Sequence, residues 1–499
     1  MTQPSPLTLT VGSWVVPNRR WILGYALMVG APILALAAIL EYGASSLAPT
    51  EIPALARDAA GSGIGSSVLN LVILLLQIAI VVVAARSAGM IARRMGQPQV
   101  VGEMAAGILL GPSFLGVWAP QLYHALFPPS SLGHLGTLSQ VGLLLFMFMV
   151  GMEFDPRMLR KEGHAAFLTS HVSISVPFLL GALLALYLYP RLAEQGVSFP
   201  EFALFIGAAM SVTAFPVLAR ILSERNMLRT RIGGVTLACA AIDDVTAWCI
   251  LAYILAMVRA NEAVSLWTTM GGLTLFVFLM FTVVRRLLRH FETVYRKRGR
   301  VSDDMMGLIL LFLLASAAVT EWLGVHILFG AFLFGAMLPK NEGFLLQVSE
   351  KLHSIAVVLF LPIFFAFTGL RTSLGSIQGA EMWFYCLLIT AVAVAGKLGG
   401  SAVAARISGL SWREAAVIGT FMNTRGLMQL VILNIGLDLG IISPTLFSMM
   451  VVMALVTTFM TTPVLQWIGP RSPHPESQPA PRSGLTPSLE PETGIAHPV

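Results

Sequence analysis

Apolar segments of bilayer length follow one another along most of this chain. A helix needs about 20 consecutive apolar residues to cross the hydrocarbon core of a membrane. Of the 499 residues, 56% are hydrophobic and 11% are charged, which leaves too few polar side chains to cover a soluble protein of this length. We therefore predict an all-α polytopic membrane protein with about 14 transmembrane helices. The predicted spans are 22–41, 67–86, 98–116, 137–153, 165–188, 201–222, 231–258, 265–286, 305–323, 325–339, 354–370, 381–406, 413–437 and 443–467.

Basic residues concentrate in alternate loops between these spans. If the loop before the first span is cytoplasmic, 25 Lys and Arg residues fall on that side, 4 on the opposite side and 2 inside spans. Cytoplasmic loops of membrane proteins carry such an excess. Both termini are therefore predicted to be cytoplasmic, in the cell (inner or plasma) membrane. The basic run from Arg296 to Arg300 is interpreted as a topology and lipid-headgroup signal, so no nucleic-acid partner is expected.

Two adjacent aspartates lie near the middle of the span 231–258. One charge at the centre of a membrane helix costs about 2.5 to 3.5 kcal/mol on insertion scales, so Asp243 and Asp244 must face protein or water. Adjacent side chains diverge by about 100° on a helix, so one carboxylate could face an ion cavity and the other a fixed charge. Divergence also argues against an aspartyl enzyme, whose carboxylates must converge on one bond. The alternative is a pair that only packs helices together.

Two basic residues also lie inside spans, too far from the ends to reach water easily. Lys397 lies in 381–406 and Arg425 in 413–437, and each requires a carboxylate or carbonyl partner. For Arg425, which stays protonated, neutralising charge in the helix bundle is the structural alternative. Burial can let a lysine exchange a proton near physiological pH. Glu153 and Asp155 end a span just before a basic loop, and we interpret them as a helix-end charge cluster.

An internal repeat relates the two halves of the chain. The sequence FIGAAM at 205–210 matches VIGTFM at 417–422, and polar, helix-interrupting residues follow each copy. Weaker similarities relate the segments that end at Pro112 and Pro339, and those that end at Asp155 and Leu370. Because the matched helices lie seven spans apart, the halves have opposite orientation. This pattern is typical of secondary transporters, whose sites lie where paired discontinuous helices, here 201–222 and 413–437, unwind at mid-membrane.

Polar residues near these interruptions are candidate cation ligands. Ser211, Thr213, Thr246 and Asn423, with the carbonyls of unwound backbone, could supply the oxygens that a hard cation requires. The alternative is that the hydroxyls bond to their own helix backbone, as Ser and Thr do in membrane helices. Asn423 could instead cap a half-helix.

Several motifs together resemble one family of transporters. They are QPQVVGEMAAGILLGPS, LLFMFMVGMEFD, MSVTAFPVLARIL, AAIDDVTAW, GVHILFGAFLFGAMLP, VAGKLGG and NTRGLMQLVILNIG, and they span about residues 67 to 467. The chain resembles the monovalent cation:proton antiporter-2 family, which includes plant cation/proton exchangers and the membrane domain of glutathione-gated potassium efflux antiporters.

This resemblance implies a 13-helix inverted-repeat antiporter fold with a dimerisation domain and a mobile core, hence a homodimer. It implies that Asp244 binds the cation and protons in turn, and that Asp243 pairs with Lys397. The chain departs from the family pattern at Gln429, where many relatives have a glutamate, which removes an acidic partner for Arg425. An additional span, 22–41, precedes the usual core.

The expected domains are an N-terminal helix and loop at 1–66, an exchanger domain at 67–469 and a disordered, Pro-rich cytoplasmic tail at 470–499. The tail carries no dinucleotide fingerprint, so direct gating by a dinucleotide is not expected. No cofactor is predicted. The predicted function is not enzymatic. It is antiport of Na⁺ or K⁺ against protons, with the cation and H⁺ competing for Asp244. The alternative is a gated cation efflux pathway without obligatory proton coupling.

Overall fold

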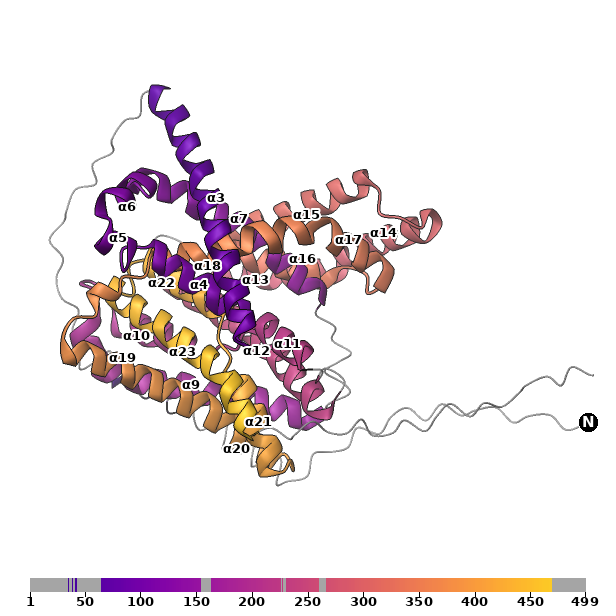
Figure 1. Cartoon of the computed structure of the whole chain (residues 1–499). Helices are drawn as coiled ribbons and strands as arrows, with labels where there is room; N and C mark the ends of the chain where they lie inside the picture. Colours follow the sequence, from indigo (N-terminus) through magenta and orange to yellow (C-terminus); the bar gives the residue numbers. More distant parts are fainter. Residues whose placement is uncertain are drawn as a thin grey trace, which may run out of the picture.

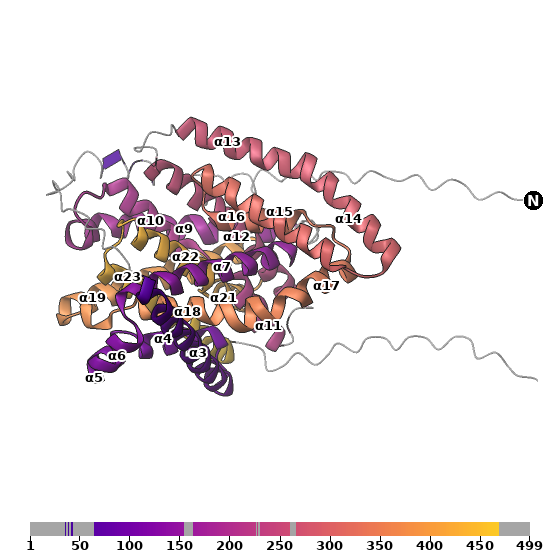
Figure 2. The same cartoon turned by 90° about the horizontal axis from the view of Figure 1, so that it is seen from above.

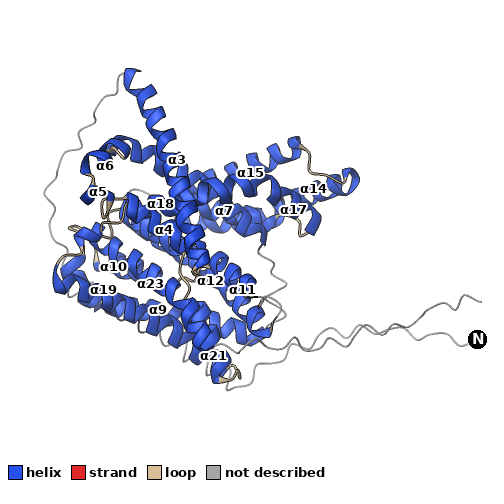
Figure 3. Ribbon diagram, viewed as in Figure 1, coloured by secondary structure: helices blue, strands red, loops and turns tan. Residues whose placement is uncertain are grey.

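The computed structural model describes residues 64–153, 163–225, 230–259 and 266–468, together with Met227 and four isolated residues before residue 64. The predicted first span, 22–41, lies almost wholly outside this description, and so does the predicted disordered tail, 470–499. The described elements are helices, and no strand occurs among the described residues (Figure 3).

One group of helices, called the first bundle here, occupies the upper part of Figure 1. It consists of α3 (Ile64–Arg94), α4 (Gln99–Leu110), α7 (Pro129–Glu153), α15 (Asp303–Trp322), α16 (Ile327–Met337), α17 (Glu342–His353), the π-helical turn η4 (Ser354–Phe360) and α18 (Leu361–Leu370). Two short helices, α5 (Leu115–Trp118) and α6 (Pro120–Leu126), lie between α4 and α7.

Glycines bring the helices of the first bundle into close contact. A Cβ atom at Gly107 of α4 would lie 2.2 Å from the carbonyl oxygen of Ala366 in α18. A Cβ atom at Gly335 of α16 would likewise lie 2.2 Å from the carbonyl oxygen of Phe148 in α7. The helix pairs α4–α18 and α7–α16 thus meet backbone to backbone, which a larger residue would prevent.

A second group of helices, called the second bundle here, occupies the lower part of Figure 1. It consists of α9 (Gly163–Leu192), α10 (Phe199–Ser211), α11 (Phe215–Glu224), α12 (Arg231–Arg259), α19 (Gly379–Val394), the π-helical turn η6 (Ala395–Gly399), α20 (Gly400–Ile407), α21 (Trp412–Met422), α22 (Leu427–Asp438) and α23 (Pro444–Ile468).

A continuous helical stretch connects the two bundles along one side of the molecule (Figure 2). It runs from α13 (Leu266–Leu279) through the π-helical turn η3 (Met280–Val284) to α14 (Arg285–Arg298). The sequence changes there from uncharged and largely apolar to strongly basic, and α14 buries only Leu288 and Phe291. Such a basic amphipathic end is typical of a helix that leaves the bilayer at a headgroup surface.

The two helices that carry the matched repeat sequence begin in the same way. At the start of α10, Ser198 accepts a hydrogen bond from the Glu201 N–H, and its own N–H donates to the Glu201 carboxylate at 3.0 Å. Ser411 and Glu414 form the same reciprocal pair at the start of α21, where the Ser411 N–H donates at 2.8 Å. Both pairs are capping boxes, which satisfy the free N–H groups of a helix start.

Each predicted span from 67–86 onward coincides with described helices. Among the described residues, ten helices are long and apolar enough to cross a membrane, or up to eleven if the bent pair α21 and α22 forms one span. The helices α10 and α16 are apolar but shorter. The protein is therefore a helical multi-pass membrane protein, while the total of 14 spans stays a prediction.

Candidate functional site

Two helix breaks lie side by side inside the second bundle. The first separates α10 from α11, and the second separates α21 from α22, whose axes differ by 41°. The Ala214 N–H in the first break donates to the Thr424 carbonyl in the second at 3.1 Å, and Thr213 Oγ1 lies 3.2 Å from the Met422 carbonyl. The breaks thus satisfy part of each other's backbone, and the groups that remain free can face a site.

Asp243 of α12 is completely buried and accepts hydrogen bonds from three hydroxyls. Ser170 Oγ donates to Oδ1 at 2.6 Å, and Ser173 Oγ donates to Oδ2 at 2.8 Å. Thr213 Oγ1 donates to Oδ2 at 2.7 Å. Since these donors come from α9 and from the break after α10, Asp243 holds three elements of the second bundle together.

Lys397 forms an ion pair with Asp243, the pairing implied by the resemblance. Its Nζ lies 2.8 Å from Asp243 Oδ2, and both side chains are fully buried. The same ammonium donates to the carbonyls of Ser173, at 2.8 Å, and of Ser211. Three strong acceptors match the three N–H donors of an ammonium group, so the charge is fully satisfied. Lys397 lies in the π-helical turn η6, an irregularity frequent at functional sites.

Asp244 lies in a different environment from its neighbour. Its side chain is only 2% exposed, and its Oδ1 has no hydrogen-bond partner. The backbone N–H of Phe215, in the first turn of α11, hydrogen-bonds the carboxyl group. A small niche around Asp244 is lined by Val150, Phe215, Ala241 and Phe332. An apolar niche around an unpaired carboxylate oxygen leaves a place for one small charged or polar group.

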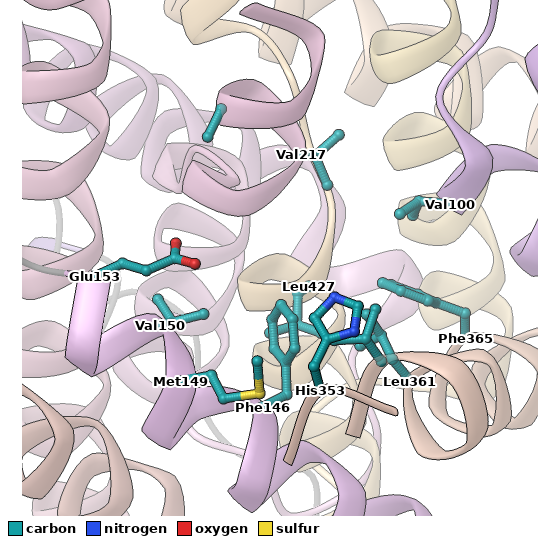
Figure 4. Close-up of a pocket in the computed structure, with 12 residues that line it drawn as sticks. Val100, Phe146, Met149, Val150, Glu153, Val217, His353, Leu361, Phe365 and Leu427 are labelled. Carbon is teal, nitrogen blue, oxygen red and sulfur yellow. The ribbon is translucent and has the colours of Figure 1, made fainter. Parts of the chain in front are cut away.

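A cavity of about 350 Å³ leads from one face of the molecule toward this niche. It lies between the bundles, because α7 and α18 line it on one side and Val217 and Leu427 on the other. Val150 lines both the cavity and the niche of Asp244. Glu153 and His353 approach the cavity from different sides, as Figure 4 shows. Their helix ends adjoin loops that are predicted to be cytoplasmic.

Arg425 is the second basic residue expected inside a span. Among the described residues, no carboxylate lies within ion-pair distance of its guanidinium. Its Nη1 donates to the Val212 carbonyl at 2.9 Å and to the Ala209 carbonyl at 3.4 Å, while Nε and Nη2 have no partner. The guanidinium thus lies at the C-terminal end of α10, where the helix dipole is negative. Nearby in the sequence, Gln429 donates to the Met450 carbonyl at 3.4 Å.

The side chains of the other candidate cation ligands differ in their hydrogen-bond partners. Ser211 Oγ donates to the Ala208 carbonyl and Thr246 Oγ1 to the Ile242 carbonyl, each within its own helix. Thr213 contacts Asp243 and not Asp244. Asn423 donates to the Met460 sulfur at 3.7 Å, and its Oδ1 is buried without a partner. Asn423 is thus the candidate whose side-chain oxygen is buried without a hydrogen-bond partner.

Sequence reasoning missed Ser170 and Ser173, the hydroxyl donors to Asp243. Both occur in the apolar span 165–188, in the sequence LTSHVSISV. Their three-residue spacing places them on one face of a helix, and this was the available signal. Their partner could not be identified without knowing that α9 packs against α12.

Comparisons with known proteins agree on one family. The family model described as "Sodium/hydrogen exchanger, transmembrane" matches residues 78–468. The Na⁺/H⁺ antiporter NhaS4 of Synechocystis sp. is 41% identical over 81% of this chain and 99% of its own length. The K⁺/H⁺ antiporter 1 of Saccharomyces cerevisiae is 34% identical over 76% of this chain. The chain belongs to the transmembrane sodium/hydrogen exchanger family.

Relatives differ in how much of their length the chain covers. It spans 44% of the yeast protein and 48% of the Cation/H⁺ antiporter 17 of Arabidopsis thaliana, to which it is 38% identical. A solved structure, the sodium proton antiporter MjNhaP1 of Methanocaldococcus jannaschii at pH 8, aligns with a TM-score of 0.59 over 80% of this chain and 98% of that chain. Because the identity is 14%, this match establishes the fold, a helical polytopic antiporter fold.

Proposed function

We propose that the protein is a secondary active antiporter that exchanges Na⁺ or K⁺ for protons, which occupy Asp244 in turn. The observation that carries the proposal is the buried carboxyl of Asp244, whose Oδ1 has no partner, in a niche that shares Val150 with the interbundle cavity. Membership of the exchanger family identifies the protein as a transporter and not an enzyme.

The environment of Asp244 makes an empty, ionised carboxylate unstable. Burying an ionised group without a paired charge costs far more than burying the neutral form. Asp244 is therefore stabilised by a proton or by a bound cation, and the two exclude each other at one site. Since movement of the loaded site is favoured over movement of the bare charge, the chain exchanges the two ions without covalent chemistry.

Asp243 has a separate role in this proposal. Three hydroxyls and the Lys397 ammonium already satisfy its carboxylate, so it holds a fixed charge beside the exchanging one. A cation at Asp244 requires further oxygen ligands. Asn423 Oδ1 is free, and the carbonyls of the broken helices are candidates. Arg425 supplies compensating positive charge near the breaks, while Ser211 and Thr213 contribute through Lys397 and Asp243.

We also propose that the two halves form an inverted repeat, with α10–α11 and α21–α22 crossing at their breaks. Two observations support it: the matched helices share a capping box, and equivalent helix pairs, α4–α18 and α7–α16, meet through glycines. The second bundle then acts as the mobile core of the exchanger domain. The first bundle is then the part that forms the homodimer contact implied by the family resemblance.

The charge distribution supports a location in the cell membrane with both termini cytoplasmic. In that orientation the cavity at Glu153 and His353 opens to the cytoplasm. The cation then reaches Asp244 from the cytoplasmic side in the conformation described here.

The proposal is tested by proton movement in proteoliposomes loaded with a pH-sensitive dye. An imposed outward gradient of Na⁺, K⁺ or Li⁺ should drive protons inward even when the proton gradient opposes their entry. The expected result is uphill proton movement with at least one of the three cations. Cation flux that only follows its gradient, with no coupled proton movement, would instead identify a gated cation pathway.

A further inference from the structure

A polar cluster joins the two bundles at the face opposite the cavity that Glu153 and His353 line. Arg371, directly after α18 of the first bundle, donates through Nη2 to Asp438 Oδ1 at 2.6 Å and through Nη1 to Asn434 Oδ1 at 2.9 Å. Asp438 and Asn434 belong to the last two turns of α22 in the second bundle. Asn434 Nδ2 also donates to Thr368 Oγ1 of α18 at 3.0 Å.

Further contacts extend this connection. The Ser373 N–H, near the short helix η5 (Leu374–Ser376), donates to Ser448 Oγ of α23 at 2.9 Å. The Arg371 guanidinium also lies 5.9 Å from the ring centre of Phe447 in α23. Planar arginine side chains that combine an ion pair, an amide contact and an aromatic contact are held in one geometry. The cluster therefore fixes the relative position of the bundles at this face.

The cluster acts on the element that carries the site. The helix α22 has 12 residues and so extends about 18 Å from the break beside Asn423 to Asp438. A helix is stiff over this length, so a displacement of the core at the break moves Asp438 relative to Arg371. A cavity of about 350 Å³ on this face is lined by α7, Arg371 and Asp438 and ends at the cluster.

We propose that Arg371, Asn434 and Asp438 form an interbundle latch that closes the outer face and stabilises the conformation open toward the cytoplasm. Arg371 is a positioning residue: it contacts no ion at Asp244 and acts through the position of α22. The core moves to its outward-facing position only when the contacts of Arg371 with α22 break. This inference rests on the proposed exchange of conformations between the two bundles, but not on the identity of the ion.

Removal of the latch should change the populations of the two conformations. Loss of a partly exposed ion pair and of one additional charged hydrogen bond should shift the equilibrium between the two conformations by roughly fivefold. Arg371→Gln and Asp438→Asn should each increase the outward-facing fraction. The cytoplasmic cation concentration at half-maximal transport should rise in inverse proportion to the fraction of protein that is open toward the cytoplasm, because only that conformation binds the cytoplasmic cation.

The test is electron–electron distance measurement between spin labels at His134→Cys and Gln195→Cys in full-length protein without native cysteines. Both positions are exposed, one on α7 and one between α9 and α10, and the predicted topology places both at the outer face. Arg191→Gln is the matched control, since Arg191 lies near this face and its Nη1 donates to the Tyr187 carbonyl of its own helix. The expected result is an enlarged second distance population in Arg371→Gln and in Asp438→Asn, and an unchanged distribution in the control.

The exchanged pair, Arg371→Asp with Asp438→Arg, should restore the wild-type distribution. Identical distributions in the wild type and both single variants would overturn the latch. Shifted distributions that the exchanged pair fails to restore would also overturn it, because the contact itself would not be the cause. The distances are measured without ion flux, so failure of the latch is distinguishable from failure of exchange at Asp244.

Discussion

Substitution of Lys397 by glutamine should destabilise the protein measurably while leaving it folded. The ammonium is fully buried and contacts Asp243 Oδ2 at 2.8 Å and two carbonyls of other helices. Removal of one partner from a buried ion pair costs about 3 to 5 kcal/mol. Asp243 keeps three hydroxyl donors, and a glutamine amide can reach one carbonyl, so we expect a value near the lower limit.

A loss of about 3 kcal/mol corresponds to a decrease of roughly 6 °C in the melting temperature, at about 2 °C per kcal/mol for a large domain. The assay is thermal unfolding of purified protein, followed by intrinsic fluorescence. Lys351→Gln is the matched control, because Lys351 forms an exposed pair with Asp303 at 2.7 Å, and such pairs contribute little to stability. Its melting temperature should equal that of the wild type.

Two further measurements make the prediction specific. In a double-mutant cycle, Lys397→Gln combined with Asp243→Asn should cost less than the sum of the single variants, because the pair is already broken in each. The ratio of protons to cations should stay unchanged, since the exchanging carboxyl is Asp244. Equal melting temperatures for Lys397→Gln and the control, or additive losses in the cycle, would refute the role of the pair. An altered ratio would make Lys397 a proton carrier.

Three other predictions concern competition, topology and packing. The cation concentration at half-maximal transport should rise toward acid pH, by up to about tenfold per pH unit, because a proton occupies Asp244 and excludes the cation; a pH-independent value would contradict competition. In intact cells, an impermeant thiol reagent should fail to label Arg298→Cys and should label Gln378→Cys. The reverse pattern would mean that a helix has been miscounted. Gly335→Ala should lower the melting temperature, since its Cβ would lie 2.2 Å from a carbonyl oxygen of α7. Gly271→Ala, whose Cβ would have nothing within 4 Å, should leave the melting temperature unchanged. Equal melting temperatures of the two variants would contradict the close packing.

Much of the fold could be predicted because the bilayer restricts the possible structures. Apolar length and loop charge are local properties of the sequence, and the predicted spans from 67–86 onward coincide with helices. The helix breaks were also predictable, because Pro216 and Gly426 interrupt otherwise apolar spans. Charge burial was predictable for the same reason: Asp243, Lys397 and Arg425 had to find partners in a medium without water.

The identity of those partners was less predictable. Lys397 and Asp243 are 154 residues apart, and only the family resemblance suggested their contact. The hydroxyl donors Ser170 and Ser173 depend on how α9 packs against α12, which no local pattern specifies. In the sequence, Arg371 falls in the loop between the predicted spans 354–370 and 381–406, and no local pattern indicates its partners. Its partners lie more than 60 residues further along the chain, where tertiary packing brings α22 next to α18.

The central claim is that one carboxyl, Asp244, binds the cation and the proton in turn. The most direct measurement is the release of protons when Na⁺ or K⁺ is added to the purified, detergent-solubilised protein at weakly buffered pH. The wild type should release protons in proportion to cation bound, and Asp244→Asn, which has no titratable carboxyl, should release none while keeping the wild-type melting profile. Cation-dependent proton release that persists in a folded Asp244→Asn variant would contradict the account.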